Sequence, residues 1–338
     1  MWIKYLPVFL PLLSWRKIWN LFAIELSLVL SNLLRKSFVW GMPTQIMVEP
    51  TNICNLQCPL CANGAGVLGR RPDYLDLEVF KSTINELHPW LTQILFWNQG
   101  EPFLSKTFLE MVRYTVDRKI FTLASTNGHF LNNAQEICDS GLHALTISLD
   151  GATEDTYLKY RIGGDFQKVL KGIRGIVQFK RKNHKKTPVL ILQLVITRLN
   201  EHEVPKIRKL ARELEVNYLL LKTAEIPNKE DLEVYSPQTP RYRRYFSGND
   251  IPFRKNCPKL WTQPVLNSNG EWSVCCFDKT VTFPLGSSKQ NGGNFREIWT
   301  SRQFNTFRKL VYKDRNNFPM CIDCSAHLKL FFDFEKTG

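Results

Sequence analysis

The stretch QIMVEPTNICNLQCPLC, residues 45–61, contains the pattern that decides the fold. It begins with a β-branched, apolar segment, Gln45–Glu49, which predicts a buried strand. Three cysteines follow on one loop, with three residues between Cys54 and Cys58 and two between Cys58 and Cys61. Three thiolates on one short loop can bind three irons of a cubane and leave the fourth iron open, whereas iron–sulfur clusters normally take four cysteines. Half of a zinc site is the alternative, but zinc explains neither the third cysteine nor the strand before it.

From residue 44 to residue 222, short β-branched segments alternate with stretches that have the apolar period of a helix. Strands separated by helices predict parallel βαβ units with right-handed crossovers. The pattern predicts an α/β fold, a partial (β/α)6 TIM-like barrel, whose active site would lie at the C-terminal ends of the strands. The predicted strands are Gln45–Glu49, Gln93–Trp97, Phe121–Ser125, Ala144–Leu149, Val189–Ile196 and Tyr218–Lys222, and the predicted helices are Leu77–Leu87, Leu104–Arg118, Ala134–Ser140, Phe166–Lys182 and Glu203–Leu214.

Composition divides the chain into four regions. Residues 41–225 hold the alternating strands and helices, and residues 226–256 are rich in Pro, Asn and charge, as a linker would be. Residues 257–338 are predicted to form a small, loop-rich domain organised around a metal centre, since four of its five cysteines have metal-like spacing. Residues 1–40 are predicted to form an apolar helical segment.

The N-terminal segment contains an apolar stretch, Ile18–Leu34, that is interrupted by Glu25 and followed by Arg35 and Lys36. Seventeen residues with a carboxylate among them make a marginal membrane span. Two other interpretations stay open. The segment could form an amphipathic helix that lies in a membrane interface, or a helix that caps the catalytic domain.

The formal charge of +14 and the pI near 9.4 are compatible with a nucleic acid, an anionic membrane surface or an anionic small substrate as a partner. Basic runs occur at residues 180–186 and 241–245, and the first closes a predicted helix, where cations favour the helix dipole. We recognise no nucleic-acid-binding module in the sequence. Nine cysteines, seven of them at ligand-like spacing, fit metal binding in a reducing cytoplasm better than disulfides.

The CxxxCxxC run, with Leu60 before its last cysteine, resembles the radical S-adenosylmethionine (SAM) superfamily, and the resemblance extends from about residue 43 to residue 221. In that family the three cysteines hold a [4Fe–4S] cluster whose open iron binds SAM. Reductive cleavage of SAM then gives a 5′-deoxyadenosyl radical, while the protein orients the cofactor and excludes side reactions. The resemblance therefore implies that Cys54, Cys58 and Cys61 are cluster ligands. It also implies an external reductant such as flavodoxin or ferredoxin.

Segments after the later strands are similar to the SAM-binding motifs of this family. Residues 98–102, NQGEP, correspond to the segment that receives the SAM amino group, although Gln99 replaces a glycine; a turn with a helix-capping acid is the alternative. Ser148 and Arg161 correspond to residues that bind the SAM carboxylate and ribose, and a guanidinium offers a carboxylate a bidentate fork. Asp150, which precedes a glycine, could equally form a turn. The resemblance implies the cofactor-binding residues Leu60, Gln99, Gly100, Glu101, Asn127, Ser148, Arg161 and Val195.

A second set of cysteines, Cys257, Cys275, Cys321 and Cys324, has ligand-like spacing, for which a zinc site is one interpretation. It resembles the SPASM and twitch extensions of radical SAM enzymes, which bind auxiliary [4Fe–4S] clusters. Because no cysteine follows Cys324, the resemblance implies one fully ligated auxiliary cluster rather than two. Cys276 is the alternative to its neighbour Cys275 as a ligand.

The resemblance implies an enzyme that abstracts hydrogen from a small polar substrate, such as a sugar, an aminocyclitol or a glycan precursor, which could be anionic. The auxiliary cluster would then accept an electron. Peptide or protein maturation and tRNA modification are the alternatives, and a zinc-dependent binding protein is the non-enzymatic one. Glu225 and Lys222, at or just beyond the last predicted strand, are candidate catalytic residues by position only. We expect a cytoplasmic protein, which would associate with the inner face of the membrane if residues 1–40 lie in the interface.

Overall fold

The computed structural model describes residues 6–226, 228–244, 257–289, 294–322, 324 and 332–337. Part of the predicted linker, and residues 1–5 of the N-terminal segment, lie outside the described residues. The chain divides into two compact units. The first unit comprises Met1–Ile53, Gly69–Thr122 and Phe253–His327, and the second comprises Cys54–Leu68, Leu123–Pro252 and Leu328–Gly338.

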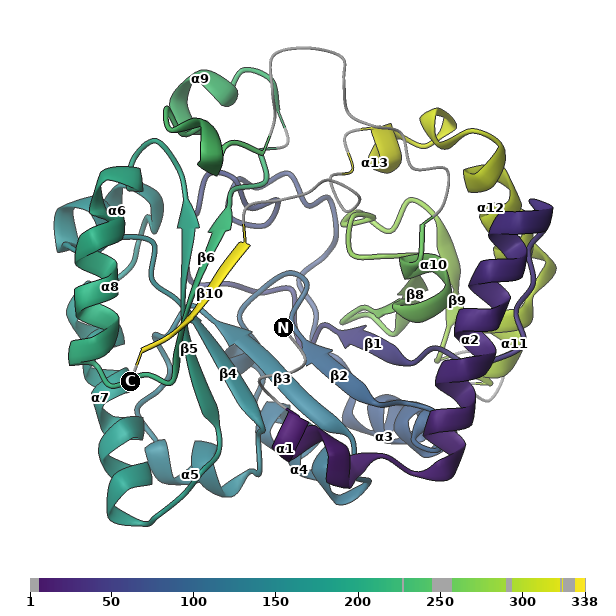
Figure 1. The fold of residues 1–338 in the computed structure, drawn as a ribbon, viewed down its shortest axis with the longest axis horizontal. Helices are drawn as coiled ribbons and strands as arrows, with labels where there is room; N and C mark the ends of the chain where they lie inside the picture. The colour runs from purple at the N-terminus through teal and green to yellow at the C-terminus, as the bar shows by residue number, and fades with distance from the viewer. Residues whose placement is uncertain are drawn as a thin grey trace. The chain divides into compact units, whose positions relative to one another are not determined.

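The second unit is built on a parallel sheet whose strand order is β10-β6-β5-β4-β3, with only β10 antiparallel to its neighbour (Figure 1). Strand β5 reads VLILQLVI, an almost continuous apolar run, as expected for a parallel strand covered on both faces. In Figure 1, helices α6, α7 and α8 lie along the outer side of β4, β5 and β6. The strands are β3 (Phe121–Thr126), β4 (Ala144–Ser148), β5 (Val189–Ile196), β6 (Tyr218–Thr223) and β10 (Phe332–Lys336), and the helices are α5 (Ala134–Asp139), α6 (Glu154–Tyr160), α7 (Phe166–Lys182), α8 (Val204–Glu213) and the short α9 (Leu232–Tyr235).

Strand β10 protects the edge of β6, and the sequence did not predict it. Phe334 stacks on Tyr218 with the ring centroids 4.7 Å apart. Arg208 donates to the carboxylate of Glu335 over 2.6 to 3.0 Å. An unpaired edge strand would expose a row of backbone donors and acceptors, so this late strand completes the sheet of the second unit.

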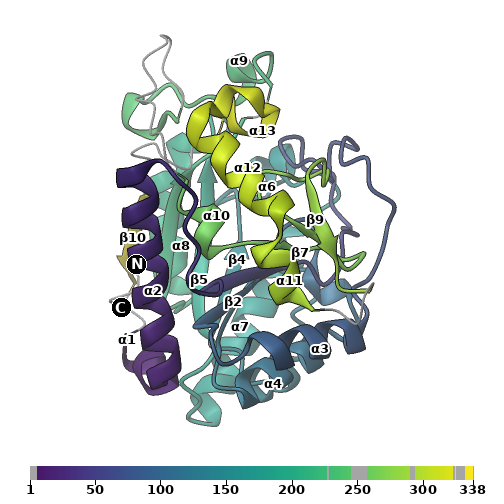
Figure 2. The same ribbon diagram turned by 90° about the vertical axis from the view of Figure 1, so that its right-hand side faces the viewer.

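In the first unit, β1 lies between two parallel neighbours, β2 and β7, and the order is β2-β1-β7-β8-β9. The C-terminal region thereby extends the sheet that β1 begins, because Met47 and Val48 pair with Val265 and Leu266. Helices α3 and α4 pack side by side (Figure 2). The strands are β1 (Gln45–Val48), β2 (Gln93–Phe96), β7 (Val265–Leu266), β8 (Glu271–Ser273) and β9 (Pro284–Ser287), and the helices are α3 (Leu77–Leu87) and α4 (Phe108–Asp117).

The C-terminal region has an apolar core in addition to its loops. Trp261, Trp272 and Trp299 are completely buried, and Trp272 packs on Phe295 with the ring centroids 4.2 Å apart. Arg308 is also completely buried and donates to the backbone carbonyls of Leu260 and Trp299. The helices that carry this core are α10 (Lys259–Thr262), α11 (Phe295–Thr300), α12 (Arg302–Lys313) and α13 (Pro319–Ile322).

The N-terminal segment forms α1 (Leu6–Phe9) and the long helix α2 (Trp15–Leu34). Ser14 caps α2 by accepting a hydrogen bond from the backbone N–H of Lys17. Arg35 ends the helix in the left-handed conformation, with φ of 51°. By length and composition this helix is apolar enough to span a membrane, although a third of its most apolar part is buried inside the protein.

The predicted α/β architecture, with its parallel sheet and N-terminal helix, is confirmed. Every predicted strand is present, and their ends differ by one residue at most. The helix predicted at Leu104–Arg118 begins only at Phe108, because Pro102–Leu104 form a separate 3-10 turn that Glu101 caps. The domain boundaries drawn from composition stay a prediction.

Candidate active site

The cysteine loop of the second unit brings nitrogen donors close to two of its sulfurs. The backbone N–H of Leu56 and the side-chain amide of Asn127 donate to Sγ of Cys54 over 3.5 and 3.8 Å. Nη1 of Arg161 donates to Sγ of Cys58 over 3.7 Å. Hydrogen bonds from N–H groups favour the charged form of an acceptor, so these contacts suit anionic, metal-bound sulfur.

The same loop is packed in apolar surroundings. Leu60 and Cys58 are buried in a cluster with Tyr160, and Val195 packs against this cluster. Burial raises the pKa of the Cys58 thiol to about 11, while the guanidinium of Arg161 acts in the opposite direction. Metal binding must therefore displace a proton from this sulfur. The dry surroundings also limit access of water to a group bound there.

Arg161 is held by a buried carboxylate. Oδ2 of Asp150 accepts hydrogen bonds from Nε and Nη2 of Arg161 over 2.7 and 2.6 Å. The Asp150 side chain is completely buried and that of Arg161 is 13% exposed. Burial acts to lower the pKa of Arg161, but the Asp150 carboxylate raises it well above its usual value. Arg161 is thus a fixed cation whose Nη1 side faces the cysteine loop.

The ends of β3, β4 and β5 bring further predicted residues to this place. The side-chain amide of Asn127 donates to Oδ1 of Asn55 in the cysteine loop over 2.8 Å. The hydroxyl of Ser148 accepts from Nε2 of Gln193 over 3.2 Å, across the pair of strands β4 and β5. The backbone N–H of Val195 donates to Oδ1 of Asp150 over 2.8 Å. The second unit therefore places these side chains at one end of its sheet, together with the cysteine loop.

In the first unit, the NQGEP segment packs tightly on residues 51–53. Gly100 has φ of 74°, and a Cβ atom built there would lie 2.3 Å from the carbonyl oxygen of Thr51. Only glycine fits both conditions. The backbone N–H of Glu101 donates to the carbonyl of Ile53 over 2.8 Å, and Gln99 and Glu101 are both buried. This segment is therefore fixed against the residues that directly precede Cys54.

Glu49 is a positioning residue that sequence reasoning missed. Its completely buried carboxylate accepts hydrogen bonds from both terminal nitrogens of Arg70 over 2.7 and 2.8 Å. The side chain of Asn98 and the backbone N–H of Gln99 donate to it over 2.9 and 3.2 Å, and the hydroxyl of Ser268 donates over 3.0 Å. The sequence offered one signal for this network, a glutamate at the end of an apolar strand. A carboxylate in that position is buried, and a buried carboxylate needs hydrogen-bond donors around it.

The C-terminal cysteines lie in one neighbourhood of the first unit. Burial raises the pKa of Cys257, and the charge of Cys324 acts in the same direction. Burial also raises the pKa of Cys321 to about 11, with the charges of Cys257 and Cys324 acting in the same direction. Cys275 is buried and interacts with Cys257. Sγ of Cys276 instead contacts Nζ of Lys259 at 3.3 Å. None of the nine cysteines, all of which are described, forms a disulfide.

Known families account for both cysteine regions. Residues 48–211 match the model of the radical SAM superfamily, and residues 257–325 match SPASM, an iron–sulfur cluster-binding domain. This chain belongs to the radical SAM superfamily. It is a radical SAM enzyme with a C-terminal SPASM domain, so a SAM-binding [4Fe–4S] cluster, SAM and SPASM auxiliary iron–sulfur are its cofactors.

Among curated proteins, this radical SAM enzyme is similar to the PqqA peptide cyclase of Rhodopseudomonas palustris, with 25% identity over 296 residues, 80% of this chain and 77% of that protein. The crystal structure of BtrN in complex with AdoMet and 2-DOIA gives a TM-score of 0.52 at 17% identity, covering 83% of this chain and 92% of BtrN. Streptococcus suis SuiB bound to S-adenosylmethionine gives a TM-score of 0.60 at 12% identity, covering 82% of this chain and 70% of SuiB. At these identities the two structures establish the partial barrel fold alone.

The residues of the cysteine loop fit the cluster that the radical SAM family requires. Three sulfurs lie on one loop, and N–H donors are directed at two of them. Three thiolates that each bind one iron would leave the fourth iron of a cubane open. This donor set therefore suits an iron–sulfur cluster.

Lys222 and Glu225, predicted by position, lie beside the residues that hold the cluster loop. Burial lowers the pKa of Lys222, and the nearby cation of Arg244 acts in the same direction, while Asp150 and Glu225 oppose it. The carboxylate of Glu225 lies 3.7 Å from Nη2 of Arg244. The structure thus brings a lysine with a reduced pKa to the same end of the second unit's sheet as Arg161.

Proposed function

We propose that this radical SAM enzyme removes a hydrogen atom from a small polar substrate, such as a sugar, an aminocyclitol or a glycan precursor. The observation that carries the proposal is the set of charged side chains at the end of β6, namely Lys222, Glu225 and Arg244, beside Asp150 and Arg161. A few charged groups set among apolar side chains are typical of the sites that bind small molecules. The guanidinium of Arg244 would also favour an anionic substrate.

The cluster loop and its neighbours have distinct tasks in this proposal. Cys54, Cys58 and Cys61 would hold the SAM-binding cluster. SAM and the iron–sulfur centres, when bound, supply the radical that removes the hydrogen atom and an acceptor for the electron that the substrate loses. Gln99, Gly100 and Glu101 would receive the SAM amino group through a fixed backbone.

Arg161 and Ser148 would bind the carboxylate and ribose of SAM, with Asp150 holding the guanidinium in place. Asn127 and Leu60 would line the same pocket, and Val195 would pack against the adenine. Because two nitrogens of Arg161 already bind Asp150, its Nη1 side is the part left to face the cofactor. Asp150 therefore acts through Arg161 as a positioning residue.

Lys222 would act as the base for the substrate. Its lowered pKa increases the fraction of neutral amine, which can accept a proton from a substrate hydroxyl as the carbon is oxidised. Glu225 would orient the substrate together with Arg244. We further propose one auxiliary cluster, ligated by Cys257, Cys275, Cys321 and Cys324, because Cys276 is engaged by Lys259.

Two other substrate classes have support of their own. The similarity to the PqqA peptide cyclase favours a peptide or protein maturase. The net charge of +14 favours a tRNA-modifying enzyme, which we rank last because the sequence shows no nucleic-acid module. For each class, we expect a cytoplasmic enzyme that receives electrons from a flavodoxin or a ferredoxin.

One experiment separates the three classes. The anaerobically reconstituted enzyme is incubated with SAM, a reductant and an extract of its native organism that has been divided into small molecules, peptides and RNA. We expect substrate-dependent 5′-deoxyadenosine only with the small-molecule fraction. Stimulation by the peptide or the RNA fraction alone would replace the proposal. The variant Lys222→Gln should cleave SAM in the active fraction yet form no oxidised product, and normal turnover would remove Lys222 from the mechanism.

A further inference from the structure

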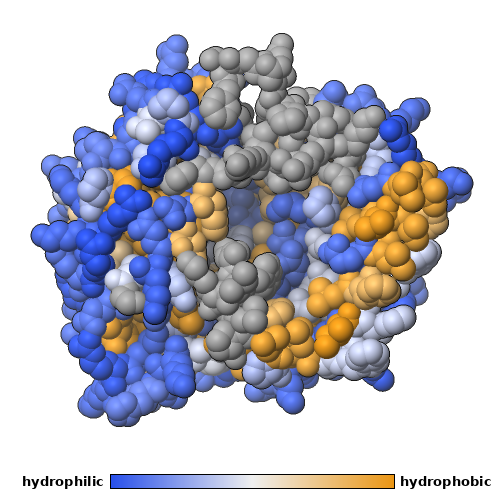
Figure 3. Space-filling model, viewed as in Figure 1, coloured by the Kyte–Doolittle hydropathy of each residue, from blue (hydrophilic) through white to orange (hydrophobic). Residues whose placement is uncertain are grey.

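The outward side of α2 carries a continuous apolar stripe, beside which the exposed Glu25 and Asn32 lie. Seven of its residues lie within an arc of about 100° when successive residues are placed about 100° apart around the helix. Six of the seven are exposed, from 46% at Ile18 to 76% at Trp15, and Leu26 is partly buried. Figure 3 shows apolar surface along this helix. This apolar stripe consists of Trp15, Ile18, Trp19, Phe22, Leu26, Val29 and Leu33.

The opposite side of α2 is buried against the first unit and contains polar side chains beside Ile24 and Leu28. Nζ of Lys17 donates to the carbonyls of Leu12 and Lys119. The side chain of Asn20 exchanges two hydrogen bonds with the backbone of Met42, and the hydroxyl of Ser27 accepts one from the N–H of Trp40. A surface helix normally has the reverse arrangement. These contacts hold α2 alongside the first unit, with the apolar stripe facing outward.

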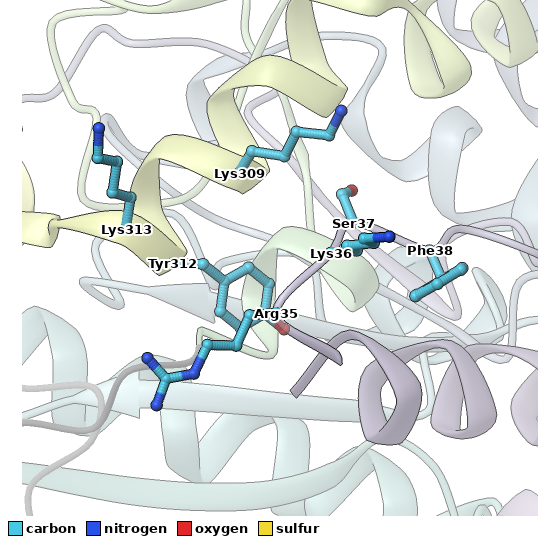
Figure 4. A pocket seen from close by; sticks show the side chains of 7 residues that line it. All are labelled: Arg35, Lys36, Ser37, Phe38, Lys309, Tyr312 and Lys313. Atoms are coloured by element: carbon cyan, nitrogen blue, oxygen red, sulfur yellow. The ribbon is translucent and has the colours of Figure 1, made fainter. Parts of the chain in front are cut away.

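A basic rim adjoins the C-terminal end of the stripe. Arg35 and Lys36, which follow α2, and Lys309 and Lys313 of α12 line a pocket of about 690 Å³ (Figure 4). All four side chains are exposed, and the described residues that line this pocket include no carboxylate. Within the described part of the chain, none of the four forms an ion pair. Four uncompensated cations beside an apolar stripe match the phosphates and acyl chains of an anionic bilayer.

We propose that the apolar stripe and the basic rim dock this enzyme on an anionic phospholipid bilayer, with α2 lying parallel to the membrane plane. Trp15, Trp19 and the exposed Trp40 would lie at headgroup depth, where tryptophan is enriched. The pocket of the basic rim would take a lipid phosphate. A second copy of the chain is the poorer partner, because a two-fold interface sets the same patch against itself, and neither the stripe nor the rim contains a carboxylate to pair with the four cations. The proposal goes beyond the proposed reaction and does not depend on it.

The test is co-sedimentation of the full-length enzyme with vesicles of phosphatidylcholine alone or of equal parts phosphatidylcholine and phosphatidylglycerol. We expect binding to the anionic vesicles that weakens as salt is added, with little binding to the neutral ones. Trp19→Ser with Phe22→Ser should weaken binding about tenfold or more. Lys309→Ala with Lys313→Ala should weaken it about 30-fold, as expected for two lysines near an anionic surface.

The controls change an exposed apolar residue and two exposed lysines elsewhere on the surface. Val234→Ser removes an apolar side chain that is 50% exposed on α9. Lys206→Ala with Lys209→Ala removes two exposed lysines from α8. Both controls should bind vesicles like the unchanged enzyme, and all variants should keep SAM cleavage.

Three results would overturn the proposal. The unchanged enzyme could fail to sediment with anionic vesicles. Light scattering could instead show a dimer that the stripe variant abolishes, which would make this side of α2 an interface between copies. Membrane-bound enzyme that resists extraction by alkaline carbonate would indicate a span.

Discussion

Replacing Asp150 with asparagine tests the part of the site that the structure defines most sharply. The carboxylate binds two nitrogens of Arg161 through Oδ2 and the backbone N–H of Val195 through Oδ1. In Asp150→Asn, either the amide N–H₂ faces the guanidinium donors or it faces the N–H of Val195. Each orientation leaves a buried donor without an acceptor and leaves Arg161 as an unpaired cation.

The expected cost follows from burial. Asp150 is fully buried and Arg161 is 13% exposed, and breaking such a pair from one side costs about 3–5 kcal/mol. For a chain of 338 residues, about 2.1 cal/mol/K of unfolding entropy per residue converts this into a fall in Tm of about 4–7 °C. The affinity for SAM should fall at least tenfold, because Arg161 is no longer held in place.

The assay is anaerobic thermal unfolding together with equilibrium binding of SAM to the reconstituted enzyme. Asp139→Asn is the matched control, because Asp139 pairs with Lys185 at 2.9 Å on the surface, where both side chains are more than 40% exposed. An exposed pair contributes about 0–1 kcal/mol, so the control should lose about 1 °C or less. If Asp150→Asn behaves like the control in both assays, Asp150 does not position Arg161.

The remaining predictions concern the auxiliary centre, the Glu49 network and a buried histidine. Cys321→Ala should lower iron by about four atoms per chain and destabilise the C-terminal region, since ligand sets of this kind contribute folding energy; unchanged iron content would show that no cluster is there. Glu49→Gln should leave the buried cation of Arg70 unpaired and lower the free energy of unfolding by about 3–5 kcal/mol, which urea unfolding would measure; a loss below about 1 kcal/mol, typical of a surface pair, would refute the network. Burial lowers the pKa of His143 to about 4 in the folded protein. Below about pH 6.5, the ordinary pKa of a histidine, the unfolded chain therefore binds more protons than the folded one. The free energy of unfolding should fall by at most about 3 kcal/mol as the pH drops from about 6.5 to 4. His143→Gln should flatten that part of the stability curve while the exposed control His202→Gln does not, and parallel curves would contradict the assignment.

The sequence predicted those elements whose signal is local. The apolar runs of β1 to β6 and the helical period of α3 and α7 are set by neighbouring residues, and so is the spacing of the cysteines. Strands β7 and β10 were not predictable in this way. Strand β7 has only two residues, and it is a strand because it pairs with β1, more than two hundred residues earlier. Strand β10 likewise depends on its pairing with β6.

Side-chain partners were the other information that the sequence did not contain. Arg161 was identified by resemblance, but its pairing with Asp150 was not, because Asp-Gly is equally typical of a turn. Glu49 lies next to the cysteine motif, yet its partners Arg70 and Ser268 come from distant segments. Polar residues interrupt the apolar sequence of α2, and only the fold shows that four of them, Lys17, Asn20, Ser27 and Ser31, lie on its buried side.

The central claim is that Cys54, Cys58 and Cys61 hold the cluster at which SAM is cleaved. The most direct measurement is the amount of 5′-deoxyadenosine formed from SAM under anaerobic reduction by the unchanged enzyme and by the variant with all three cysteines replaced by alanine. We predict that the unchanged enzyme forms 5′-deoxyadenosine, and that the triple variant forms none while it keeps the iron of the SPASM domain. Formation of 5′-deoxyadenosine by the triple variant would contradict the account.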